Sequence, residues 1–103
     1  MFIKVSADGS VTLEERDNFR AFKLVVTGNA AKLDAARKTL AGVAELPDEK
    51  NAWIFEAALR RFVDVAQDQA WQQNLSAMIE KAKPHGWIDE MRKAIKAHVE
   101  WQE

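Results

Sequence analysis

The chain has 103 residues, of which 48% are hydrophobic and 30% are charged. This composition is typical of a globular domain, excludes a disordered chain, and leads us to expect a single domain over residues 1–103. The absence of cysteine excludes disulfides and thiol chemistry. Fifteen Lys and Arg against sixteen Asp and Glu give a net charge of −1. The basic pairs are dispersed among acidic neighbours, so no nucleic-acid partner is expected.

The first residues bear on the cellular location that we expect for the protein. Met1-Phe2-Ile3-Lys4 is followed closely by Asp8, without the basic and then apolar run of a signal peptide. No stretch approaches the ~18 uninterrupted apolar residues that a membrane span requires. We therefore expect a cytoplasmic protein without a membrane partner.

The N-terminal third is predicted to form a small antiparallel meander. Residues 2–6 and 10–14 read as short strands around Asp8-Gly9, a pair that favours a hairpin turn. Residues 19–27 alternate apolar and other side chains and end in β-branched residues, which favours a third strand. The open alternative is a helix from Thr12, because Thr12-x-x-Glu15 has the spacing of a capping box.

Two helices are expected in the middle of the chain. Asn29 can cap a helix that runs through Leu40 and ends at Gly42. Asp48 follows a proline and is expected to cap a second helix. Apolar side chains of that second helix would share one face at i, i+3, i+4 spacing: Phe55, Ala58, Leu59, Phe62 and Ala66.

The apolar stripe then changes phase. A second coherent face consists of Trp71, Leu75, Met78, Ile79 and Ala82. Either the helix breaks near Asp68, which could cap a new helix, or one long helix over residues 49–83 carries two apolar faces. The sequence Lys83-Pro84-His85-Gly86 ends whichever helix precedes it.

The C-terminal segment fits two patterns equally well. Residues 87–93 could form a short helix followed by an edge strand over residues 94–101, or the helix could continue. Together the patterns predict an α+β fold. It consists of a small N-terminal antiparallel β-meander, which the C-terminal strand could join, packed by three or four α-helices.

No motif predicts catalysis, a cofactor or a metal. Asp8-Gly9 followed by Glu15 resembles half of a calcium-binding loop, but Lys4 occupies its first ligand position, so we reject calcium. The spacing of the two histidines, His85 and His98, matches no metal pair. The carboxylates and glycines are likewise typical of turns and solvated surface. The sequence predicts no catalytic, cofactor-binding or metal residue, and leans away from an enzyme.

Tryptophan is the most unusual component, because four tryptophans occur and there is no tyrosine. On one long helix, Trp53 and Trp71 would emerge on the same side, since eighteen residues make five turns at about 3.6 residues each. Large aromatic side chains anchor many protein interfaces. The candidate interface residues are therefore Trp53, Trp71, Leu75, Met78 and Trp101. The alternative is that the tryptophans complete the core.

These observations leave two hypotheses for function. The first is a protein–protein interaction or self-associating module, with a homodimer or another protein as its partner. The second is a small enzyme or ligand-binding protein with an apolar, aromatic-lined pocket between sheet and helices. In that pocket Arg16, Arg20 or His98 would fix an anionic ligand.

Overall fold

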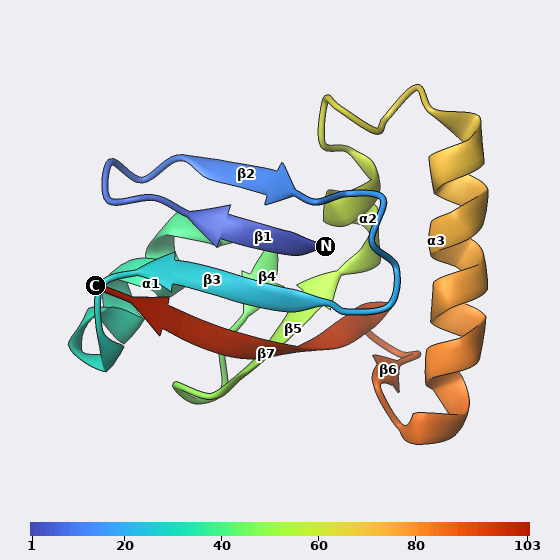
Figure 1. The fold of residues 1–103 in the computed structure, drawn as a ribbon. Coiled ribbons are helices and arrows are strands. Elements are labelled where there is room, and N and C mark those ends of the chain that lie inside the picture. Colours follow the sequence, from blue (N-terminus) through green and yellow to red (C-terminus); the bar gives the residue numbers. More distant parts are fainter.

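One mixed sheet of seven strands organises the fold, and the computed structural model describes all residues from 1 to 103. The spatial order is β2-β1-β3-β7-β5-β4, with β6 also paired to β7. The sheet curves into a half-barrel (Figure 1). The strands are β1 (Phe2–Val5), β2 (Val11–Glu14), β3 (Lys23–Thr27), β4 (Ala44–Glu45), β5 (Asn51–Phe55), β6 (Ile88–Asp89) and β7 (Ala94–Gln102).

Helices make up a smaller part of the fold than expected. The α-helices are α1 (Leu33–Thr39), α2 (Glu56–Arg60) and α3 (Gln69–Ala82), and short 3-10 turns η1 (Ala30–Lys32) and η2 (Lys83–His85) adjoin α1 and α3. Only α3, with 14 residues, is long. It stands beside the ends of the sheet where β1, β3 and β7 begin (Figure 1). The predicted small meander packed by three or four helices is therefore wrong, because the sheet dominates.

The N-terminal hairpin is confirmed, but the third strand pairs differently. β1 and β2 are antiparallel, which also rules out the alternative helix from Thr12. β3 lies on the other side of β1 and runs parallel to it, so the three strands are not an antiparallel meander. The connecting segment 15–22 turns at Glu15, with a positive φ of 46°, and crosses beside the start of β1. There the Met1 ammonium donates to the carbonyls of Asn18 and Ala21, at 2.9 and 3.0 Å.

The predicted helix after Asp48 is wrong over its first part. The Asp48 carboxylate accepts hydrogen bonds from the backbone N–H groups of Lys50 and Asn51, both at 2.8 Å, and so closes a turn that leads into β5. These hydrogen bonds hold the pKa of Asp48 below its usual range. Residues 51–55 alternate between half-buried and buried, the period of a strand. The helical spacing that begins at Phe55 is satisfied only by the short helix α2.

The predicted helix start at Asn29 is confirmed, and of the two alternatives at Asp68 the structure has the new helix. The side chain of Asn29 accepts from the backbone N–H of Ala31, at 3.0 Å, and the turn η1 continues into α1. The carboxylate of Asp68 accepts from the backbone N–H of Trp71, also at 3.0 Å, and caps α3. A new helix therefore begins after Asp68, and a single helix over residues 49–83 does not form.

The last strand is central instead of lying at an edge. β7 runs parallel to β3 and antiparallel to β5 and β6 (Figure 1, red). Residues 87–93 form no α-helix, because β6 and a turn occupy that segment. The alternating burial in β7 follows from this position, since its inward side chains meet the core while the outward ones meet solvent.

The core lies on one face of the sheet, where the helices cover it. Twenty buried residues form one cluster, to which α1, α2 and α3 contribute Ala36, Leu59 and Trp71, among others. The strands contribute side chains of β1, β3, β5 and β7, including Ile3, Leu24, Ile54 and Val99. No buried side-chain nitrogen or oxygen lacks a hydrogen-bond partner.

Candidate pocket beside the first half of β7

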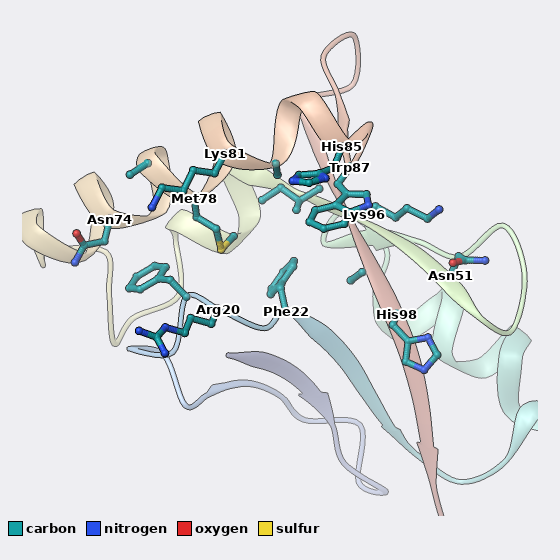
Figure 2. A pocket seen from close by; sticks show the side chains of 15 residues that line it. Arg20, Phe22, Asn51, Asn74, Met78, Lys81, His85, Trp87, Lys96 and His98 are labelled. Atoms are coloured by element: carbon teal, nitrogen blue, oxygen red, sulfur yellow. The ribbon is translucent and has the colours of Figure 1, made fainter.

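A break in strand pairing lies along one side of β7. β3 pairs with β7 from His98 onwards, whereas β6 pairs with Ala94 and Ile95. Between these stretches Lys96 and Ala97 have no partner strand on that side. The backbone N–H of Lys96 donates there to the carbonyl of Trp87, at 2.7 Å. A pocket of about 720 Å³ opens at this break, between the sheet and α3 (Figure 2).

More than half of the lining is apolar. Figure 2 shows Phe22 and Met78 reaching into the cavity from opposite sides, with Trp87 near one end. A volume in this range is typical of pockets that hold small organic molecules. The eight hydrophobic lining residues are Phe19, Phe22, Ala77, Met78, Ala82, Trp87, Ile95 and Ala97.

The polar lining carries positive charge and no carboxylate. Arg20, Lys81 and Lys96 form no ion pair within 4.0 Å, whereas five other basic residues of the chain do. Because the whole chain has a net charge of −1, this charge is a local property of the pocket. The seven polar lining residues are Arg20, Asn51, Asn74, Lys81, His85, Lys96 and His98.

The segment that supplies one wall is held by α3. The indole N–H of Trp71 donates to the carbonyl of Arg16, at 2.8 Å, and the Phe19 ring lies 5.8 Å from that of Trp71. Arg16 itself turns away from the pocket and donates to the carbonyl of Asp64. These contacts fix the backbone from which Arg20 and Phe22 project.

The opposite wall contains an exposed aromatic stack. His85 and Trp87 stack with ring centroids 4.4 Å apart and an angle of 17° between their planes. The turn between them depends on Gly86, whose φ of 76° favours glycine. Trp87 is 49% exposed, an unusual state for so large a side chain. The pocket therefore offers a flat aromatic face that the core does not use.

A carboxylate near the pocket on β7 is already engaged. Glu100 accepts from the ammonium of Lys23 at 3.2 Å and from the side-chain amide of Gln102 at 3.0 Å. The Lys23 ammonium, followed by Gln102, holds the pKa of Glu100 below its usual value. Glu100 is thus ionised and paired at neutral pH, and its partner lies outside the pocket.

The structure brings together two of the three predicted ligand-fixing residues. Arg20 and His98 line the pocket, while Arg16 does not. Sequence reasoning missed Lys81 and Lys96. Two signals could have indicated them, since Lys96 and His98 alternate on one strand, and Lys81 lies one turn beyond Met78.

The five candidate interface residues do not share one face. Trp71 and Leu75 are buried in the core, and Met78 lines the pocket. Trp53 is on β5, with the Arg92 guanidinium 5.6 Å from its ring, and the Trp101 indole donates to the carbonyl of Glu49 at 2.8 Å. The shared helix face that suggested the interface does not exist. Self-association itself stays a prediction.

The remaining motifs of the sequence add no second site. No group of three or more His, Asp or Glu side chains could hold a metal ion. The half calcium loop is a hairpin turn, in which the Asp8 carboxylate accepts from the backbone N–H of Ser10 at 2.9 Å. No helix is long and apolar enough to cross a membrane. No family of known proteins, no curated protein and no solved structure matches this chain.

Proposed function

We propose that this protein binds a small organic anion with an apolar body. The observation that carries the proposal is a pocket of about 720 Å³ whose apolar lining includes Phe19, Phe22 and Trp87, and whose polar lining includes three cations without an ion pair and no carboxylate. Arg20, Lys81 and Lys96 are exposed and have no acidic partner, so an anion bound among them would gain charge-assisted hydrogen bonds.

The apolar side chains supply affinity in this proposal. Phe22, Met78 and Trp87 would cover the body of the ligand, and each removes apolar surface from water at about 25 cal/mol per Å². The flat face of Trp87 favours a planar ligand, since aromatic rings gain from offset stacking.

The cations supply selectivity. Arg20 presents a planar guanidinium that can hold a carboxylate, sulfonate or phosphate through two parallel hydrogen bonds. Lys81 projects into the same cavity from α3 and adds a second positive charge. A neutral analogue of the same ligand would lose these interactions, and a cationic one would be repelled.

A fluorescence titration tests the proposal. Anilinonaphthalene sulfonate is a planar aromatic anion whose emission rises in apolar sites, and neutral phenylnaphthylamine has nearly the same shape. We expect saturable binding of the sulfonate, weakened about tenfold or more when Arg20→Met, Lys81→Met and Lys96→Met are combined. The neutral dye should respond little to the same change.

A matched control guards against indirect effects. Lys32→Met with Lys38→Met removes two exposed charges beside or within α1 that do not line the pocket, and should leave sulfonate binding unchanged. Melting curves of both variants should match that of the parent. Non-saturable binding, or equal binding by all three proteins, would contradict the proposal.

A further inference from the structure

The basic residues of the pocket form two separate groups. On one side, Arg20 and Lys81 lie with Asn74 (Figure 2). Asn74 and Lys81 are seven positions apart on α3, so they project from one helix face.

The second group stands on the sheet. Lys96 and His98 are alternate residues of β7 and point to the same side of it. Asn51 of β5 is paired with His98 in the antiparallel register and joins them. Figure 2 places these three side chains on the opposite side of the cavity from Arg20 and Asn74.

The stretch between the two groups is apolar. Phe22 and Met78 lie between them in the view of Figure 2, and Trp87 borders the same stretch above the break in the sheet. A ligand with its charge in the middle would therefore desolvate that charge against apolar side chains, at a cost no partner offsets. An anionic group at either end instead meets basic side chains, Arg20 and Lys81 at one end and Lys96 at the other.

We infer that the pocket takes an elongated organic dianion with a flat apolar body and an anionic group at each end. The inference rests on the proposed anion-binding function and adds the shape and charge of the ligand. One anionic group lies between Arg20 and Lys81, the other beside Lys96 and His98. The side-chain amide of Asn74 can donate one further hydrogen bond at the first end, whereas that of Asn51 donates to the Asp48 carboxylate.

Calorimetric titration with two probes tests the inference. Biphenyl dicarboxylate carries a carboxylate at each end, and biphenyl monocarboxylate carries only one. We expect the dianion to bind about tenfold tighter, the usual gain from one additional charge-assisted pair.

Two double variants then remove one end at a time. Arg20→Met with Lys81→Met, and Lys96→Met with His98→Gln, should each reduce the dianion to about the affinity of the monoanion. Each should weaken the monoanion by only about twofold, because that probe can turn and use the remaining end. The Lys32→Met, Lys38→Met protein is the control, and all variants should keep the parent melting temperature.

The outcomes separate the two proposals. If both probes bind with equal affinity and only one double variant weakens them, the pocket has a single anionic end. The inference is then overturned while the proposed function stands. If neither probe binds and anilinonaphthalene sulfonate does not bind saturably either, both are overturned.

Discussion

The two halves of β7 have the same alternating sequence and meet different neighbours. From Val99 to Gln102 the strand has a partner on one side throughout, β3, and its inward side chains enter a filled core. Around Lys96 and Ala97 that partner is missing, and the space beside the strand is a pocket. Where β3 pairs with β7 the sheet is continuous and the core is filled. Where this pairing is missing, a pocket is open to a ligand.

The largest effect on stability is expected from a comparison of two positions in one segment. Leu24 of β3 is fully buried in the core, whereas Phe22, two residues earlier, is half-buried and lines the pocket. Leu24→Ala should lower the free energy of unfolding by about 2–5 kcal/mol, because it removes buried methyl groups and leaves a cavity. Phe22→Ala should cost about 1 kcal/mol but weaken binding of the aromatic anion. Urea denaturation measures the loss of unfolding free energy in both variants. Equal losses would contradict the distinction between a core position and a pocket position.

The second test compares two indole hydrogen bonds. Trp71 donates to the carbonyl of Arg16 beside the pocket wall, and Trp101 donates to that of Glu49 at the other end of the sheet. Trp71→Phe should cost about 1–3 kcal/mol, because it leaves a partly buried carbonyl without its donor. It should also weaken anion binding, since Arg20 and Phe22 project from the loosened segment. Trp101→Phe should leave binding unaffected; a loss in both proteins would indicate a global effect.

A third, smaller effect concerns the start of α3. The Asp68 carboxylate caps this helix, which carries Met78 and Lys81 into the pocket. Asp68→Ala should lower the free energy of unfolding by about 1 kcal/mol, the usual cost of a lost N-cap. Asp64→Ala is a matched control, because the side chain of Asp64 is exposed and caps nothing. Thermal denaturation followed by circular dichroism compares the two, and equal melting temperatures would argue against the cap.

The smallest effect is a pH dependence in the well-paired half. The ammonium of Lys23 lowers the pKa of the Glu100 carboxyl in the folded state, so the pair stabilises the fold above the unfolded-state pKa of about 4.3. That contribution is lost as the pH falls through the lower folded-state value. Glu100→Gln should therefore lower the melting temperature slightly at pH 7 and not at all in strong acid. A difference that persists in acid would assign the effect to packing instead.

Local signals in the sequence predicted local structure correctly. Asp8-Gly9 identified the hairpin, and Asn29 and Asp68 identified two helix starts, because a turn or a cap depends on a few neighbouring residues. The stripe from Trp71 to Ala82 likewise gave the buried face of α3.

Non-local pairing was beyond the reach of the same reasoning. Phe55 begins a true helical spacing but also ends a strand, and only its pairing with Ala94 decides between them. No feature in the sequence of either strand indicates the parallel pairing of β3 with β1. Arg20 and His98 were identified as candidate residues by their type alone. That they share a pocket with Lys81 depends on three segments meeting, which no spacing encodes.

The central place of β7 has a consequence for how the chain folds. Residues 94–102 come after every other strand in the sequence, and the pair of Lys23 with Glu100 joins positions 77 residues apart. The ribosome therefore releases β3 and β5 before their shared neighbour exists, and the edges that will pair with β7 stay unpaired until then. A sheet closed by such distant contacts forms slowly, because the loop entropy is lost before the contacts compensate for it. During synthesis this protein is expected to remain sensitive to proteases until residues 94–102 have left the exit tunnel.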